Sequence, residues 1–129
     1  MNANGTRVLI IDDDPLIRTL LVSALRKDCL VGVAGEGSEG FSKALELKPD
    51  VAVIDVNMPG WDGLKTLEAF RAHPSLRETK IIMLTADSSK QTVMAAVRAG
   101  ANDYLTKPVD VERLLTLLRV WLFKQEMAA

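Results

Sequence analysis

Residues 51–63 read VAVIDVNMPGWDG and carry the clearest signal for the fold. The first four residues, Val51 to Ile54, are continuously apolar rather than alternating, as is typical of a strand covered on both faces. The run stops at a carboxylate, Asp55, and the segment after it, which contains Trp61, is expected to be a loop. The stretch therefore predicts a buried strand that ends on an acidic residue.

The same alternation of short apolar runs and longer amphipathic stretches occurs five times along the chain. We expect strands at residues 8–11, 30–34, 51–54 and 81–84, and a weaker one around Tyr104-Leu105. We expect helices at residues 15–27, 38–47, 64–72, 88–99 and 109–124. Strands alternating with helices predict an α/β fold, in which a parallel sheet is covered by helices on both faces.

Helix punctuation supports these boundaries. Pro15 can open a helix, and Ser38 and Ser88 can cap one. Gly100 can end a helix and Pro49 stops another. The sequence has no internal repeat, low-complexity tract or linker, so we expect one domain over residues 1–129.

Composition excludes several classes of protein. The chain has 48% hydrophobic and 26% charged residues, which argues against disorder and against a disulfide-stapled miniprotein. The net charge of −1 gives no basic excess for direct binding of nucleic acid. The start of the chain does not resemble a signal peptide, and no apolar run approaches the ~20 residues that span a membrane. The single cysteine, Cys29, fits a reducing cytoplasm.

Polar or charged residues end four of the five expected strands. They are Asp12-Asp13-Asp14, Asp55, Thr85 and Lys107-Pro108. Because ligands bind outside the carboxyl ends of parallel strands, these residues should meet at one edge of the sheet. The carboxylates of Asp12, Asp13 and Asp55 and the ammonium of Lys107 together carry a charge of −2, which one divalent cation balances. Carboxylate oxygens suit a hard ion such as Mg²⁺.

This constellation resembles the receiver domain of two-component response regulators over nearly the whole chain. The residues that carry the resemblance are Asp12-Asp13, Asp55 within VIDVNMPGWDG, Thr85-Ala86, Tyr104 and Lys107-Pro108. Thr85 lies thirty and Lys107 fifty-two residues after Asp55, as in that family. The resemblance implies a doubly wound, flavodoxin-like (βα)5 fold with strand order 2-1-3-4-5. It also implies that Asp55 accepts a phosphoryl group from a histidine kinase or a histidine phosphotransfer protein.

The resemblance assigns roles to the site residues. Mg²⁺ would be held by Asp13, by Asp55 and by the backbone carbonyl of Asn57, with Asp12 acting through water. Lys107 would offset phosphoryl charge, and Thr85 would donate its hydroxyl to a phosphoryl oxygen. Asp14 is expected to start a helix rather than bind metal. The chain would be a signalling phosphoacceptor rather than an enzyme with turnover of its own.

Two further expectations concern the lifetime and the output of the signal. Asn57 and Asp87 would lie beside the phosphoryl group and set its hydrolysis rate. Phosphorylation would draw Thr85 inward, so that Tyr104 turns from an outward rotamer and alters the face formed by the fourth helix, the fifth strand and the fifth helix.

The last helix is unusually apolar. Helical periodicity predicts a core stripe and a separate apolar flank. The stripe consists of Val111, Leu115, Leu118 and Leu122. The flank consists of Leu117, Val120 and Trp121. Three interpretations of the flank are open: ordinary surface exposure, packing against the neighbouring fourth helix, or contact with an output partner or a second receiver after phosphorylation.

Two rival readings of the site exist. Asp12-Asp13-Asp14 fits the D-x-D of a haloacid-dehalogenase-like phosphatase, but Leu16 stands where that motif wants Thr or Val, and no paired acids follow Lys107. A phosphate-independent pseudo-receiver is disfavoured because the expected site residues are all present. With no effector domain after the fifth helix, the chain is expected to be a stand-alone receiver or a fragment of a larger regulator.

Three other features have ordinary explanations. Residues 35–40 formally fit G-x-G-x-x-G but follow the second strand, which favours a loop leading into a helix over a dinucleotide site. His73 is expected at the surface near a helix end. Cys29 is expected to be half-buried beside a helix end.

Overall fold

The structure, a computed structural model, describes the backbone of residues 5–128 and the side chains of residues 5–121. Five strands alternate with five helices along the chain. The strands are β1 (Arg7–Ile11), β2 (Leu30–Ala34), β3 (Val51–Asp55), β4 (Lys80–Thr85) and β5 (Asp103–Thr106). The helices are α1 (Pro15–Leu25), α2 (Gly37–Leu47), α3 (Gly63–Ala72), α4 (Lys90–Ala99) and α5 (Val111–Ala128).

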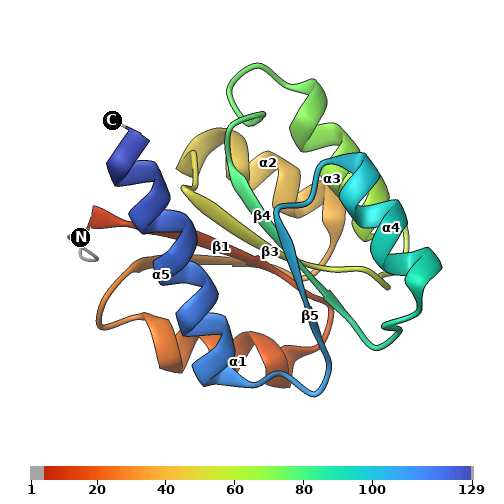
Figure 1. Cartoon of the computed structure of the whole chain (residues 1–129), viewed down its shortest axis with the longest axis horizontal. Helices are drawn as coiled ribbons and strands as arrows, with labels where there is room; N and C mark the ends of the chain where they lie inside the picture. The colour runs from red at the N-terminus through yellow and green to blue at the C-terminus, as the bar shows by residue number, and fades with distance from the viewer. Residues whose placement is uncertain (1–4, 129) are drawn as a thin grey trace.

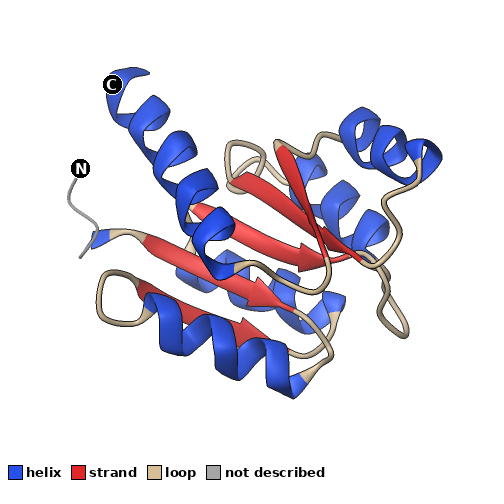
Figure 2. Ribbon diagram, turned by 60° about the horizontal axis from the view of Figure 1, so that its bottom comes forward, coloured by secondary structure: helices blue, strands red, loops and turns tan. Residues whose placement is uncertain are grey.

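The strands form one parallel sheet in the order β2-β1-β3-β4-β5, as the resemblance implied. Helices α1 and α5 cover one face of the sheet, and α2, α3 and α4 cover the other (Figures 1 and 2). The strand order reverses between β1 and β3, and in open α/β sheets ligands bind outside the carboxyl ends of the strands at such a point.

Each face of the sheet contributes to its own hydrophobic core. Leu9 and Ile11 of β1 pack toward α2 and α3, whereas Val8 and Ile10 pack toward α1 and α5. Every residue of β3 is buried, and all of β4 except Lys80 is buried. The continuously apolar strands expected from the sequence are therefore confirmed. Full burial of each such side chain contributes about 1.5–3 kcal/mol.

Most helix ends lie within two residues of the sequence expectation, whereas α5 ends at Ala128, four residues beyond the expected end at residue 124. Asp14 caps α1, because its Oδ1 accepts a hydrogen bond from the amide of Leu16 at 2.9 Å. Ser89, not Ser88, caps α4. Ser38 caps nothing: it lies inside α2, and its hydroxyl donates to Glu36 at 3.1 Å.

Two glycines decide local geometry near the sheet edge. Gly100 ends α4 as expected, with φ of 107°, a conformation that favours glycine. Gly63 begins α3 so close to the end of β3 that a Cβ there would lie 2.6 Å from the Cα of Val56 and would also overlap the carbonyl oxygen of Asp55. The absence of a side chain at Gly63 thus lets α3 start directly against the strand that carries Asp55.

The expected core stripe of α5 is displaced. Leu114, which the sequence analysis did not place in the stripe, is fully buried together with Leu118. Leu117 and Trp121, expected on a separate flank, pack against the same core, and Val120 alone of that flank is exposed, at 42%. Of the expected stripe, Leu115 is half-buried against this core as Leu117 and Trp121 are, Val111 is half-buried, and the side chain of Leu122 lies outside the described residues. Because α5 lies across the strands of a twisted sheet (Figure 1), its buried arc is wider than a narrow stripe and is centred on Leu114.

Candidate functional site

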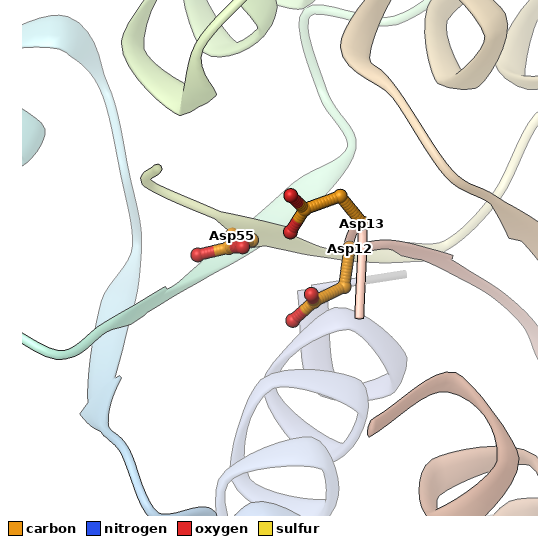
Figure 3. Close-up of side chains that lie close together, drawn as sticks. All are labelled: Asp12, Asp13 and Asp55. Atoms are coloured by element: carbon orange, nitrogen blue, oxygen red, sulfur yellow. The ribbon is translucent and has the colours of Figure 1, made fainter. Parts of the chain in front are cut away.

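The carboxyl ends of the strands bring the expected polar residues to one edge of the sheet. Asp12 directly follows β1, Asp55 is the last residue of β3, and Thr85 is the last residue of β4. Lys107 directly follows β5. Figure 3 shows Asp12 and Asp13 at the end of β1, with Asp55 beside them. The sequence reasoning about strand ends is therefore confirmed as geometry.

Lys107 joins the two buried carboxylates. Its Nζ lies 3.2 Å from Oδ2 of Asp12 and 3.3 Å from Oδ2 of Asp55. The side chain of Asp12 has no exposed surface and that of Asp55 is 4% exposed. Lys107, which directly follows the edge strand β5, thus neutralises only one of the two buried charges, and this arrangement destabilises the fold unless a further cation is present.

The pKa values reflect this imbalance. Burial, and then the charge of Asp12, raises the pKa of Asp55 from 3.8 to about 6, although Lys107 and the amide of Asn57 act in the opposite direction. Burial alone would lower the pKa of Lys107, but the charges of Asp55 and Asp12 outweigh it and raise that pKa. The site therefore favours the binding of a cation or a proton beside Asp55.

Backbone contacts fix the orientation of the acidic residues. Oδ1 of Asp12 accepts a hydrogen bond from the amide of Asp14 at 2.8 Å, and its carbonyl accepts one from Arg18 at 2.7 Å. The amide of Asn57 donates to Oδ1 of Asp55 at 3.2 Å. The sequence analysis did not identify Arg18 as a residue that supports the site. Its place in the first turn of α1, close to the end of β1, is the only signal in the sequence that could have suggested this role.

The three carboxylates fit a divalent cation. Asp12, Asp13 and Asp55 each offer an oxygen, and these oxygens all lie within 4.8 Å of one another. Asp13 is exposed and so keeps space for water, which Mg²⁺ retains in most protein sites. Oδ2 of Asp12, buried and beside Lys107, accepts no hydrogen bond from the described residues. All the donors are oxygens, which suits Mg²⁺ rather than zinc.

The hydroxyl of Thr85 is already hydrogen-bonded to the backbone of Asp87. Its Oγ1 donates to the carbonyl of Asp87 at 2.8 Å and accepts from the amide of Asp87 at 2.9 Å. The carboxylate of Asp87 is bonded to Ser89 and Thr92 at the start of α4, and Asn57 is exposed. Tyr104 is 37% exposed on β5, consistent with the outward rotamer that the sequence analysis expected.

The remaining residues singled out in the sequence have structural environments. Residues 35–40 form the loop into α2 and its first turn, in which Glu39 accepts a hydrogen bond from the amide of Gly35. His73 ends α3 and packs edge-on against Phe41, with ring centroids 5.9 Å apart. Cys29 is half-buried just after α1. Within residues 5–128, no helix combines the length and apolar character needed to cross a membrane.

Comparison with known proteins identifies the class that this fold and site define. The family model of the response regulator receiver domain matches residues 8–119. The chain therefore belongs to the response regulator receiver domain family of two-component signalling. The flavodoxin-like order of its strands agrees with that assignment.

Individual relatives support the family assignment. The chain is 36% identical over 120 residues to the nitrate/nitrite response regulator protein NarL of Escherichia coli, covering 91% of this chain and 55% of that protein. It is 32% identical over 127 residues to the DNA-binding response regulator MtrA of Mycolicibacterium smegmatis, covering 98% of this chain and 54% of that protein. The chain thus spans about half the length of these curated relatives.

A solved structure gives the same result at the level of the fold. The chemotaxis protein CheY4 of Vibrio cholerae superimposes with a TM-score of 0.86 at 32% identity, covering 90% of this chain and 98% of that chain.

Proposed function

We propose that Asp55 is the phosphoacceptor of this receiver domain and that a phosphohistidine of a histidine kinase or of a histidine phosphotransfer protein is the donor. The observation that carries the proposal is the contact of Lys107 with the carboxylates of both Asp55 and Asp12 at the edge of the sheet. A buried nucleophile beside one ammonium and two further carboxylates is arranged for a reaction in which a phosphoryl group and a divalent cation arrive together.

The reaction uses the residues as follows. A carboxylate oxygen of Asp55 attacks phosphorus in line, the O–P bond forms and the N–P bond of the phosphohistidine breaks. The electron pair of that bond returns to the imidazole nitrogen, which takes a proton from solvent. Lys107 offsets charge on the phosphoryl oxygens. Its Nζ already lies 3.3 Å from Oδ2 of Asp55, so the ammonium needs only a small movement to contact a phosphoryl group on that residue.

Asp12, Asp13 and Asp55, with the carbonyl of Asn57, would hold Mg²⁺. The ion, when bound, supplies charge that stabilises the transferring phosphoryl oxygens. The fit of the three carboxylates and the raised pKa of Asp55 support this assignment.

The signal leaves the site through Thr85 and Tyr104. Thr85 donates to a phosphoryl oxygen, Tyr104 turns inward, and the face formed by α4, β5 and α5 changes its affinity for an output domain or a second copy of the chain. We assign Asn57 and Asp87 to the lifetime of the acyl phosphate. We further place the protein in the cytoplasm, as a signalling domain without its own substrate turnover and without direct contact to nucleic acid or membrane.

The test is chemical labelling. Acetyl phosphate with Mg²⁺ should add one phosphoryl group that hydroxylamine removes, since an acyl phosphate is labile to that nucleophile. Asp55→Asn should abolish the labelling because an amide is a poor nucleophile, and Asp62→Asn, which alters an exposed acid on the same loop, should leave it intact. Recovery of the label on Asp12 would contradict the proposal and favour the phosphatase chemistry.

A further inference from the structure

A cavity of about 320 Å³ opens between one face of α1 and the edge strand β2. It begins at Pro15, two residues after Asp13, so it adjoins the acidic site. It does not share that site's residues, because its lining includes none of Asp12, Asp13, Asp55 and Lys107. Small-molecule sites in proteins have volumes of about 300 Å³ and above. The cavity therefore has room for one small ligand.

The polar groups that line the cavity can all donate hydrogen bonds. They are the guanidinium groups of Arg18 and Arg26 and the hydroxyls of Thr19 and Ser23. None of the residues that line the cavity carries a carboxylate. Within the described part of the chain, the side chains of Arg26, Thr19 and Ser23 have no hydrogen-bond or ion-pair partner. Two cations with available donors and no acid among them favour an anionic ligand, and the planar guanidinium matches a phosphate or a carboxylate.

The two arginines are held with different firmness. Arg18 is half-buried, and its Nη1 donates to the carbonyl of Asp12 at 2.7 Å. A Cβ at residue 35 would lie 3.3 Å from this Nη1, so Gly35 leaves space for the guanidinium beside the loop after β2. A guanidinium has five N–H donors, and Asp12 takes one of those of Arg18. Arg26 is exposed and lies about 12 Å further along the helix. Arg18 is therefore the preorganised group for an anion.

The cavity wall between the two arginines is apolar. Val22 of α1 and Val33 of β2 line it, and both are half-buried. Such a wall suits a planar ring, and an exposed guanidinium such as that of Arg26 can stack on the face of a ring. A ligand with a phosphate on Arg18 and a ring beside Val22, Val33 and Arg26 uses both the charged and the apolar parts of the lining. A nucleoside monophosphate has this form.

Arg18 connects the cavity with the acidic site. Its guanidinium holds the carbonyl of Asp12, whose side chain is fully buried beside Lys107. An anion on the other donors of Arg18 restrains this guanidinium, and its negative charge offsets the cation that stands next to the acidic residues. Both effects strengthen the attraction of Asp12, Asp13 and Asp55 for a divalent cation. By linkage, a bound cation strengthens the binding of the anion by the same factor.

We propose that the cavity between α1 and β2 binds a phosphate monoester that carries a planar ring, of the nucleoside monophosphate class, and that its occupancy strengthens Mg²⁺ binding at the acidic site. The first part of the proposal stands on the cavity and its two arginines. The second part rests on the proposed function, because it needs Asp12, Asp13 and Asp55 to hold the metal.

Binding is tested with AMP and the full chain in EDTA, with the backbone amides followed by two-dimensional NMR. AMP should shift the amides of residues 18–26 and of Val33. Adenosine, which lacks the phosphate, should bind about tenfold more weakly or worse, the effect of losing one hydrogen bond between charged groups. Inorganic phosphate should shift the amides around Arg18 but bind more weakly than AMP. No shifts at millimolar AMP, or shifts confined to Asp55 and Lys107, would overturn the site, and equal affinities of phosphate and AMP would overturn the role of the ring.

Variants test the residues that form the site. Arg26→Gln removes an exposed cation and should leave the fold intact, while AMP binds about threefold to fivefold more weakly. Arg98→Gln makes the same charge change at an exposed position on α4, which covers the other face of the sheet (Figure 2), and should leave AMP binding unchanged. An Arg26→Gln protein that binds AMP as tightly as the parent would contradict the assignment.

The link to the acidic site is measured as a change in Mg²⁺ affinity. Saturating AMP should lower the Kd for Mg²⁺ about fivefold, the lower end of the usual range for coupled sites. A metal indicator measures free Mg²⁺ in this titration, because AMP itself binds the ion. AMP that binds without changing the Mg²⁺ affinity would overturn the link. A chain that binds AMP but no Mg²⁺ would instead overturn the proposed metal site and the link with it, and labelling with acetyl phosphate tests Asp55 separately.

Discussion

At the scale of single residues, the charged groups of the site destabilise the fold. Asp12 and Asp55 are buried within reach of one lysine, so the domain carries an uncompensated negative charge at the end of β3. Removing charge from water without a full partner destabilises a protein, and here the imbalance raises the pKa of Asp55 to about 6. A group in this state binds a cation or a proton more tightly in the folded chain than in the unfolded chain.

The first prediction concerns pH in the absence of divalent cations. The folded state binds a proton on Asp55 with a pKa of about 6, against 3.8 for the ordinary carboxyl, so this group lowers the free energy of unfolding as the pH rises from about 4 to about 7. At 1.36 kcal/mol per pKa unit, the full effect is at most about 3 kcal/mol. Urea unfolding in EDTA at several pH values measures it. In Asp55→Asn, which cannot titrate, this decrease should vanish; an unchanged pH profile in that variant would assign the effect to another group.

The second prediction concerns Asp13. Asp13→Asn removes one of three crowded charges, so we expect the melting temperature of the metal-free protein to rise by about 2–4 °C. The same change should weaken Mg²⁺ binding by at least about tenfold, the loss that even an outer-shell partner causes. Thermal melts with and without Mg²⁺ measure both effects. Asp14→Asn is the matched control, because asparagine caps a helix as well as aspartate does. Unchanged Mg²⁺ affinity in Asp13→Asn would remove Asp13 from the metal site.

The sequence was enough to predict which charged residues meet at the strand ends. It was not enough to predict which hydrogen bonds the side chains make in the loops. Asp12, Asp55 and Lys107 meet because parallel strands end at one edge, whatever the loops do. The attachment of Thr85 to Asp87 depends instead on the turn that the chain takes after β4, where several hydroxyls and carboxylates compete for the same amides.

At the scale of elements, Arg71 joins four segments that the sequence gives no reason to connect. Its guanidinium donates to carbonyls of residues 77, 79 and 100 and to Asn102, whose side chain also accepts the amide of Ile81 in β4. In the sequence, Arg71 is an ordinary cation in the last turn of α3. Its role arises only when the sheet brings the starts of β4 and β5 next to that helix end.

The third prediction follows from this cluster. Arg71→Lys keeps the charge but loses the planar fork of donors, so some of these acceptors lose their partner. We expect the free energy of unfolding to fall by about 2 kcal/mol or more, since hydrogen bonds to charged groups contribute about 1.5–3 kcal/mol each. Arg26→Lys, at an exposed position after α1, should change it by less than about 0.5 kcal/mol. Equal effects of the two substitutions in urea unfolding would argue against a stabilising role for the Arg71 cluster.

Helix α5 marks the limit of periodicity as a guide. The 3.6-residue repeat correctly predicts an amphipathic helix, but seven of the eleven residues from Val111 to Trp121 are apolar, so several stripes fit equally well. The packing of α5 beside α1 on a twisted sheet selects the stripe through Leu114 and Leu118. That selection depends on tertiary geometry, which a single helix sequence does not contain.

At the scale of the whole molecule, three exposed large hydrophobic residues of the described chain, Leu16, Leu20 and Leu30, lie on α1 and β2, and the others lie on β5 and the two helices beside it. Strand β5 is one edge of the sheet and lies between α4 and α5 (Figure 1). Around it are four exposed large hydrophobic residues, Met94, Val97, Tyr104 and Val120. The face therefore differs from the one expected from the sequence. Val120 remains exposed, Leu117 and Trp121 are half-buried against the core, and α4 contributes more exposed apolar residues than α5.

The last prediction is that this face mediates phosphorylation-dependent self-association. In the proposed function, the rotation of Tyr104 acts on β5, so a change at Asp55 would reach this face. With beryllofluoride and Mg²⁺, sedimentation should shift from monomer toward dimer as the concentration rises. Val97→Glu places a charge on a side chain that is 58% exposed on α4 and should restore the monomer. Leu16→Glu, at a position that is 78% exposed on α1, should not, because α1 packs on β1 and β2, whereas β5 is the opposite edge of the sheet. A chain that stays monomeric at high concentration in both states excludes a second copy as the partner, and the output then requires a partner of different sequence.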